Sequence, residues 1–261
     1  MKNFLIKIKE YYGLNKASAI IMFFIGVILI SSLLMMNTMA NISSFWSVDI
    51  DEKPLPDIVH EILPLSMTNQ GIVLATVDIS MYSFLVFTVL AVLTRRDAVN
   101  IGIRMFSTIS ISYLLRILIV TQTNLPSPTS NCRKIVKNFL TEFGQDRCGD
   151  LIYSGHTIPL TICIYTWLTY SFFKSFLGEL LKNILRTRVA ILGYSTLFMI
   201  IICRMHYTID VILAIYSTTS VWIIYGLIWN KYLINEKYFN EIYRKDAKIQ
   251  KDCNKNPRNL N

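Results

Sequence analysis

Residues 148–173 read CGDLIYSGHTIPLTICIYTWLTYSFF. A short polar segment with Asp150 and His156 runs directly into an apolar stretch that contains no charged residue. A second junction of this kind, HYTIDV, occupies residues 206–211, again with a histidine and an aspartate at the start of an apolar run. The two junctions hold two of the chain's three histidines. Both therefore place ionisable side chains at the edge of a predicted membrane segment.

The chain of 261 residues is 53% hydrophobic and has a mean hydropathy of +0.44. Runs of about 18 or more nearly uncharged residues indicate membrane-spanning helices, since only helices that satisfy their own backbone cross lipid in this form. We count six runs and predict an all-α membrane protein with six transmembrane helices. The predicted spans are 17–37, 71–93, 101–121, 155–173, 189–203 and 209–229.

This pattern predicts three parts. Residues 1–16 form a cytosolic N-terminal tail, residues 17–230 form the six-helix catalytic domain, and residues 231–261 form a basic cytosolic tail. The last part is rich in Lys, Asn and Asp, a composition typical of disorder. The first apolar segment is too long for the core of a signal peptide, so we expect it to be retained as a helix.

Basic residues predict the orientation of the helices. Of the 26 Lys and Arg residues, 19 fall in the two tails, in the regions that follow the second and fourth spans, or, for Arg104, in the first turn of the third span. Basic residues accumulate on the cytosolic side, so both termini are predicted to be cytosolic. The net charge of +9 is then explained by this bias and by a basic tail near anionic lipid, and nucleic acid is not expected as a partner.

The five cysteines form no pattern of metal ligands, and no cofactor is expected. Cys163 and Cys203 lie in or at the end of apolar segments, where a thiol packs as a small hydrophobe. Cys132 and Cys148 lie in one predicted non-cytosolic loop, a compartment that permits disulfides. The sequence allows either a disulfide between these two cysteines or two free thiols.

His206 and Asp210 are four residues apart at the start of the last span, which places them on one helix face. A carboxylate there can hold one imidazole nitrogen as N–H and leave the other as a nucleophile. His156 is available as a second acid or base. These three residues suffice for group transfer through a phosphohistidine on a phosphorylated lipid. The alternative is that the histidines merely lie at the membrane interface.

Several further residues are candidates for binding a substrate. Residues 154–157 read SGHT and indicate a helix entry, whose free N–H groups attract phosphate and whose Gly155 permits close approach. Arg116 lies in an apolar span, where a charge is costly; it could hold a phosphate or pair with Asp150, or reach the interface. Arg204 is the other phosphate candidate. Asp78, about two turns inside the second span, is given no role.

These motifs resemble those of the sphingomyelin synthase family, which belongs with the lipid phosphate phosphatases in a wider superfamily. The third and fourth family motifs match closely, at residues 148–157 and 206–211 followed by Tyr216 and Tyr225. The second covers Tyr113, Arg116 and Thr123, although only Arg104 stands where the family has two adjacent Arg. The first motif, at residues 54–57, is partial.

The resemblance implies a triad of His156, His206 and Asp210 that moves phosphocholine from phosphatidylcholine to the primary hydroxyl of ceramide, releasing diacylglycerol. It also implies an active site on the lumenal or exoplasmic face, in the Golgi or plasma membrane, and it leaves open a homodimer. The expected substrate-binding residues are Asp150, Arg116, Arg204, Tyr113, Ser154, Tyr153 and Tyr207. The two tyrosines 153 and 207 would offer aromatic faces to choline.

Three other readings remain. The donor could be phosphatidylethanolamine or phosphatidylinositol. Water could replace ceramide, which would make the protein a lipid phosphatase or phospholipase C-like hydrolase, but the Ser-Arg pair typical of such phosphatases is replaced here by Met199 and Ile200. A transporter or scaffold would need neither histidine.

Overall fold

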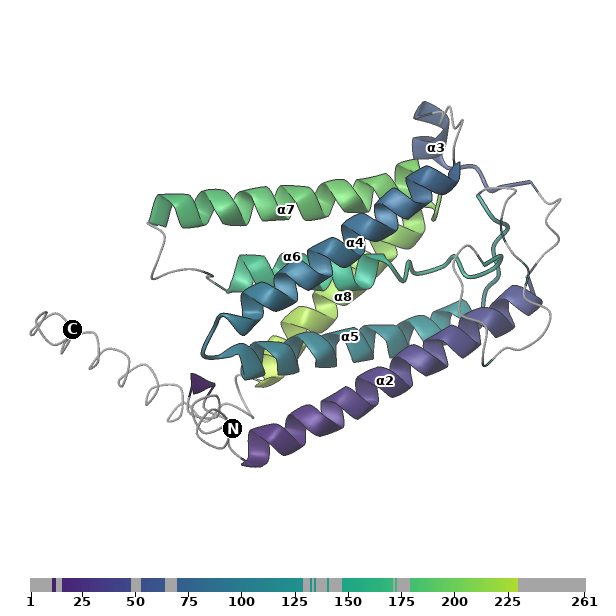
Figure 1. Cartoon of the computed structure of the whole chain (residues 1–261). Helices are drawn as coiled ribbons and strands as arrows, with labels where there is room; N and C mark the ends of the chain where they lie inside the picture. Colours follow the sequence, from purple (N-terminus) through teal and green to yellow (C-terminus); the bar gives the residue numbers. More distant parts are fainter. Residues whose placement is uncertain are drawn as a thin grey trace, which may run out of the picture. The chain divides into compact units, whose positions relative to one another are not determined.

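The computed structural model describes residues 11–12, 16–47, 53–63, 70–128, 132, 134, 140, 147–170, 172 and 179–229. Every regular element within these ranges is a helix, in agreement with the predicted all-α class (Figure 1). The helices are α2 (Lys16–Phe45), α3 (Ile58–Ile62), α4 (Gln70–Leu93), α5 (Ala98–Val120), α6 (Thr157–Thr169), α7 (Glu179–Ile202) and α8 (Thr208–Ile228).

Five of these helices contain a segment long and apolar enough to cross a membrane. The segments are Ser18–Phe45, Ala75–Leu93, Ala98–Val120, Lys182–Ile202 and Thr208–Ile228. The predicted span at 155–173 corresponds to α6, which has only 13 residues. At 1.5 Å per residue it covers about 20 Å, less than the roughly 30 Å of a hydrocarbon core. The count of six spans and the cytosolic position of the termini stay predictions.

The start of α7 differs from the predicted one, because this helix includes basic residues that the prediction placed in a loop. α7 begins ten residues before the predicted start at 189 and takes in Lys182, Arg186 and Arg188. The guanidinium of Arg186 donates hydrogen bonds to the carbonyl oxygens of Trp167 and Leu168 at the end of α6. An arginine that satisfies the last carbonyls of a helix takes the place of a further turn.

The first apolar helix also runs further than predicted, since α2 continues to Phe45 rather than ending at 37. The short helix α3 was not predicted. Asp57 caps its N-terminus, and the carboxylate accepts hydrogen bonds from the backbone N–H groups of Val59 and His60. Such a cap satisfies donors that would otherwise have no partner at the helix start.

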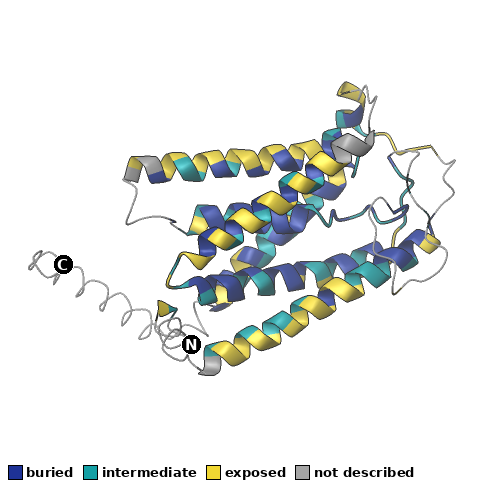
Figure 2. Ribbon diagram, in the orientation of Figure 1, coloured by how far each residue is buried: buried dark blue, intermediate teal, exposed yellow. Residues whose placement is uncertain are grey.

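α6 lies at the centre of the helices from α2 to the first turns of α8. Ten of its 13 residues are buried, and it packs against α4, α5 and α7 (Figure 2). By contrast, α2 packs along α5 and turns a largely exposed apolar face outward. A helix that is apolar all round and exposed on one side is typical of contact with lipid. The centrally placed α6 carries His156 at its N-terminal end.

The chain divides into two compact units after Trp222. The first unit contains α2 to α7 and most of α8, and all the candidate site residues lie in it. In the second unit the structure describes residues 223–229, where the rings of Tyr225 and Trp229 stack at 5.8 Å. The predicted tail at 231–261 lies outside the described residues.

Candidate active site

A cavity of about 890 Å³ opens among α2, α4 and α5 and ends at the N-terminus of α6. Its apolar part is lined by side chains such as Leu33, Leu85 and Ile109, while its polar end is formed by arginine, aspartate and both motif histidines. The lining residues at the polar end are Asn37, Arg116, Arg147, Asp150, His156 and His206. A cavity of this kind suits a molecule with a polar head and apolar chains.

His206 lies in the turn between α7 and α8 and is 5% exposed. Its Nδ1 is 2.9 Å from the carbonyl oxygen of Leu151. A carbonyl oxygen can only accept, so Nδ1 carries the hydrogen and the neutral ring has its lone pair on Nε2. The Asp210 carboxylate is 3.8 Å from the same nitrogen, beyond hydrogen-bond distance. The backbone of Leu151 therefore fixes the tautomer, and Asp210 supplies negative charge behind the ring.

Asp210 is itself held in place. It is 1% exposed, and its Oδ2 accepts a hydrogen bond of 3.0 Å from the backbone N–H of Tyr207. Its own carbonyl oxygen accepts from the backbone N–H of Ser154, at 3.3 Å. This last bond joins the first turn of α8 to the loop that precedes α6. The two sequence motifs are thus connected through their backbones.

His156 faces the carboxylate of Asp78, for which no role was predicted. Its Nε2 lies 3.2 Å from Oδ1 of Asp78 in α4. The centroids of the His156 and His206 rings are 6.1 Å apart, so both imidazoles border the same space. Each histidine thus has an aspartate near one ring nitrogen, which is Nε2 in His156 and Nδ1 in His206.

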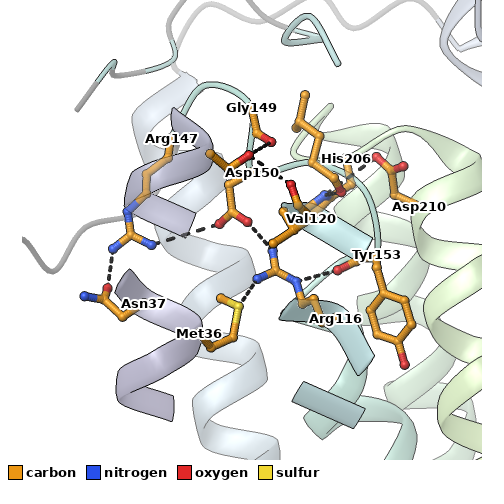
Figure 3. A network of polar contacts seen from close by, with 12 residues as sticks. Met36, Asn37, Arg116, Val120, Arg147, Gly149, Asp150, Tyr153, His206 and Asp210 are labelled. Atoms are coloured by element: carbon orange, nitrogen blue, oxygen red, sulfur yellow. Dashed lines mark hydrogen bonds and ion pairs between the residues drawn. The ribbon is translucent and has the colours of Figure 1, made fainter. Parts of the chain in front are cut away.

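Arg116 organises the polar end of the cavity and is 2% exposed (Figure 3). Its Nη2 is 2.6 Å from Oδ1 of Asp150, its Nε donates to the carbonyl oxygen of Tyr153 at 2.5 Å, and its Nη1 contacts the sulfur of Met36. Of the alternatives that the sequence left open for Arg116, the pairing with Asp150 is present. Because Tyr153 has a φ of 66°, its backbone adopts a left-handed conformation that is unusual for a non-glycine residue.

A second arginine stands on the other side of Asp150. Arg147 Nη1 is 4.0 Å from Oδ2 of Asp150, and its Nη2 donates to Oδ1 of Asn37 at 2.5 Å (Figure 3). Two guanidinium groups thus flank one carboxylate at the polar end. Guanidinium groups are the side chains that pair best with carboxylate and phosphate oxygens.

Glycines in the first junction permit close packing. A Cβ added at Gly155 would lie 3.3 Å from Cζ of Arg116, so the guanidinium rests against the backbone there. Gly149 has a φ of 77°, and a Cβ on it would lie 2.8 Å from Cβ of Ser47. Position 149 therefore requires glycine for its backbone conformation and for close packing, while an added Cβ at Gly155 would be tight against the Arg116 guanidinium.

Cys132 and Cys148 form a disulfide. Cys148 is followed directly by Gly149, whose carbonyl oxygen accepts a hydrogen bond of 2.9 Å from the hydroxyl of Ser43 in α2. The bridge and this bond hold the segment that presents Asp150 to Arg116. Most of the loop between the two cysteines lies outside the described residues.

The structure brings His156, His206, Asp150, Arg116 and Tyr113 to the cavity, while Asp210 lies directly behind His206. The other four predicted site residues are absent from the described lining. Tyr153 and Tyr207 are buried, with their hydroxyls donating to Ser217 Oγ and to the Pro126 carbonyl oxygen. Arg204 donates to the carbonyl oxygen of His60. Ser154 makes no side-chain cap of α6, whose N-cap residue is His156.

Sequence reasoning missed Asn37 and Arg147 and assigned nothing to Asp78. The signal for Asp78 was present, because a carboxylate inside an apolar span usually has a partner and a function. Arg147 directly precedes the strong motif, but nothing in its spacing distinguishes it from other basic loop residues. Within the described residues, no group of three His, Cys, Asp or Glu side chains is arranged to hold a metal ion.

Comparison with known proteins gives matches to one family model and to several relatives. Residues 147–227 match the family model described as "PAP2 superfamily C-terminal". The chain is 32% identical over 142 residues to a phosphatidylinositol:ceramide inositolphosphotransferase of Trypanosoma cruzi. That match covers 50% of this chain and 40% of the relative.

Two further relatives carry other head-group names. A phosphatidylethanolamine:ceramide ethanolaminephosphotransferase of Trypanosoma brucei brucei is 35% identical over 48% of this chain and 40% of its own length. Phosphatidylcholine:ceramide cholinephosphotransferase 2 of Caenorhabditis elegans is 30% identical over 66% of this chain and 56% of its own length. The chain thus spans about two fifths to rather more than half of these relatives. The region matched by the family model contains both junction motifs, and these matches support the resemblance to the sphingomyelin synthase family of ceramide phosphotransferases within the PAP2 superfamily.

Proposed function

We propose that this protein transfers phosphocholine from phosphatidylcholine to ceramide, and that it does so through a phosphohistidine on His206. One observation carries the proposal. Two imidazoles, each backed by an aspartate, border one space at the polar end of an apolar cavity, where two arginines supply positive charge.

In the first step Nε2 of His206 attacks phosphorus, and a P–N bond forms as the bond between phosphorus and the diacylglycerol oxygen breaks. Protonated His156 gives its proton to that oxygen, so diacylglycerol leaves as a neutral alcohol. The Asp210 carboxylate offsets the positive charge that develops on the His206 ring. Arg116 stabilises the negative charge that builds up on the phosphoryl oxygens.

In the second step the primary hydroxyl of ceramide attacks the phosphorus of the phosphohistidine. His156, now neutral, accepts the hydroxyl proton, and the P–N bond breaks. His206 returns to its neutral form, and sphingomyelin is the product. The apolar part of the cavity between α2 and α4 holds the chains of both lipids in turn, which also keeps water from the intermediate.

The choice of phosphatidylcholine as donor rests on aromatic rings. Tyr82, Phe106 and Tyr113 line the cavity, and aromatic faces attract a quaternary ammonium group. A second candidate donor has a head group with hydroxyls or a primary amine. Asn37, Arg147 and Asp150 offer hydrogen-bond partners to such a group, and relatives carry the inositol and ethanolamine names.

The test is a transfer assay with the purified protein in liposomes of one phospholipid at a time, with fluorescent ceramide as acceptor. We expect sphingomyelin and diacylglycerol in equal amounts, with slow diacylglycerol release when ceramide is absent. If product forms only with another donor lipid, the reaction class is retained and the assignment of phosphatidylcholine as donor is rejected. Equally fast release without ceramide would identify a phospholipase. The His156→Ala variant should lack both reactions.

We also propose that the site faces the lumenal or exoplasmic side of the Golgi or plasma membrane, which follows from the distribution of Lys and Arg. A tag inserted in the loop at 132–147 should be accessible from outside intact cells. Tags at either terminus should become accessible only after the membrane is permeabilised. The reverse result would overturn the orientation.

A further inference from the structure

Residues 53–63, which include α3, lie outside the segments that could span a membrane and are joined by hydrogen bonds to residues 201–208. The latter form the turn that carries His206. We propose that Asp57 is a positioning residue, which anchors this turn and thereby holds His206 in the geometry needed for attack. The catalytic part of this inference rests on the proposed function.

The carboxylate of Asp57 joins two elements. Its Oδ2 accepts a hydrogen bond of 2.7 Å from the backbone N–H of Thr208, and its Oδ1 accepts one of 2.9 Å from the Thr208 hydroxyl. The same Oδ1 accepts from the backbone N–H groups of Val59 and His60, at 3.0 and 3.3 Å. One side chain therefore caps α3 and holds the first residue of α8.

Tyr207 provides a second link beside His206. Its hydroxyl accepts a hydrogen bond of 3.0 Å from the backbone N–H of Leu55 and donates one of 2.9 Å to the carbonyl oxygen of Pro126. Burial raises the pKa of this phenol, which keeps the hydroxyl protonated and able to donate.

His60 and Arg204 link the other side of the turn. Nε2 of His60 lies 3.0 Å from the carbonyl oxygen of Ile201, and the carbonyl oxygen of His60 accepts a hydrogen bond of 2.9 Å from Nη2 of Arg204. His60 is buried, at 7% exposed, so these contacts are shielded from water. The turn is thus fixed both before and after His206.

The turn needs external support because its backbone is unusual. Arg204 has a φ of 54°, a left-handed conformation that is strained for a non-glycine residue. α7 ends at Ile202 and α8 begins at Thr208, so only five residues reverse the chain. Without the contacts to residues 53–63, the turn could relax and move the His206 ring away from Leu151.

Asp57 acts from outside the cavity. Neither Asp57 nor Thr208 belongs to its described lining, whereas His206 does. A change at Asp57 should therefore leave lipid binding intact and alter the position of the nucleophile. This separates a positioning role from a role in substrate binding.

The experiment compares Asp57→Asn, Thr208→Val and the double variant with wild type in the liposome assay. An amide oxygen can still cap α3, but the amide nitrogen cannot accept a hydrogen bond, so Asp57→Asn weakens the bonds to Thr208. Glu61→Gln is the matched control, since Glu61 lies in the same short helix and is exposed. Hydrogen exchange of the peptide containing residues 203–210 is measured in parallel, without substrate.

We expect Asp57→Asn to lower kcat roughly ten- to hundredfold with little change in KM, since small misplacements of a reacting group have effects of this size. The amide of Thr208 should exchange faster in this variant, and Glu61→Gln should match wild type. The double variant should lose less activity than the two single losses combined, because Asp57→Asn and Thr208→Val both weaken the same contact between α3 and α8.

Full kcat in Asp57→Asn, or faster exchange of the Thr208 amide with no loss of rate, would overturn the positioning role. So would additive losses in the double variant. If wild type transfers no head group from any donor while the exchange result holds, the anchor of the turn stands and the proposed function fails. If wild type is active but the Thr208 amide of Asp57→Asn exchanges at the wild-type rate, the proposed anchoring of the turn by Asp57 fails and the proposed function stands.

Discussion

The Asp78 carboxylate in α4 lies 3.2 Å from Nε2 of His156. This places a negative charge beside the histidine that must carry a proton during the first proposed step. An opposite charge at this distance stabilises an imidazolium, and Oδ1 of Asp78 is shielded from solvent. A half-buried carboxylate within an apolar helix is costly unless such a partner is present. The protein therefore has two paired imidazoles rather than one.

We predict that Asp78→Asn lowers transfer roughly tenfold or more while the protein remains folded, because the amide has no charge with which to stabilise protonated His156. Rates and thermal stability of the purified variant test this. Ser80→Ala is the matched control, since Ser80 lies in the same helix and its hydroxyl is 3.1 Å from that of Thr196. Equal losses in both variants would mean that Asp78 acts only through the stability of α4.

His206 and Asp210 should differ in how much activity their replacement removes. We expect His206→Ala to lower the rate more than about a thousandfold, because it removes the nucleophile. Asp210→Asn should cost less, roughly ten- to hundredfold, since the carbonyl oxygen of Leu151 still fixes the tautomer of His206. Single-turnover assays on folded variants measure both. A His206→Ala variant that keeps a tenth of the rate would contradict the nucleophile assignment.

The helices and the pairing of Arg116 with Asp150 could be predicted because each depends on a local signal. Apolar runs mark the helices, and a charge in such a run requires a partner. The length of α6 could not be predicted in the same way. The last carbonyls of this helix are bound by Arg186, which comes from the next helix.

Contacts between distant segments account for the other differences. The spacing of four residues predicted Asp210 and His206 on one helix face, but His206 lies in the turn before α8, and the hydrogen-bond partner of its Nδ1 is a backbone oxygen 55 residues earlier in the chain. No side-chain pattern encodes a backbone acceptor. The aromatic residues Tyr153 and Tyr207 were expected near the head group, but both hydroxyls point to other protein atoms. Their amphipathic character fits burial with one hydrogen bond equally well.

Gly155 offers a test of the position of Arg116. We predict that Gly155→Ala lowers kcat/KM for the phospholipid roughly tenfold, because the new methyl group would lie 3.3 Å from Cζ of Arg116 and displace the guanidinium. Gly26→Ala is the control, as nothing lies within 4 Å of the added atom there. Steady-state assays over a range of donor concentrations test the prediction. Full activity in Gly155→Ala would show that the close approach is unnecessary.

The stability of the protein should depend on pH through Asp57. Burial alone would raise the pKa of this carboxyl, but hydrogen bonds from Thr208 and His60 outweigh burial and hold the pKa below its ordinary value of 3.8. A lowered folded-state pKa means that ionised Asp57 stabilises the fold at pH values above 3.8, and that this contribution is lost as the pH falls through the lower folded value.

Wild type should therefore be more stable than Asp57→Asn at neutral pH, and the difference should shrink at pH values below 3.8. His60 and Tyr207 also lie near Asp57, but both are present in the two proteins. Thermal unfolding of the two proteins in detergent from pH 7 downward measures the difference. A gap in melting temperature that stays constant to the lowest pH would contradict the assignment to Asp57.

The disulfide between Cys132 and Cys148 should support activity from outside the cavity. It closes a loop with a sequence separation of 16, and a loop of about this length contributes roughly 3 kcal/mol by the chain-entropy account. Reduction should therefore lower the melting temperature and slow transfer, because Cys148 leads directly to Gly149 and Asp150. The Cys132→Ser variant should resemble reduced wild type and be insensitive to further reductant.

Cys163→Ser is the matched control, since Cys163 is a free, buried cysteine and its loss should leave the effect of reductant unchanged. Alkylation of both Cys132 and Cys148 in unreduced, folded protein would exclude the bridge and leave the roles of the two histidines unaffected.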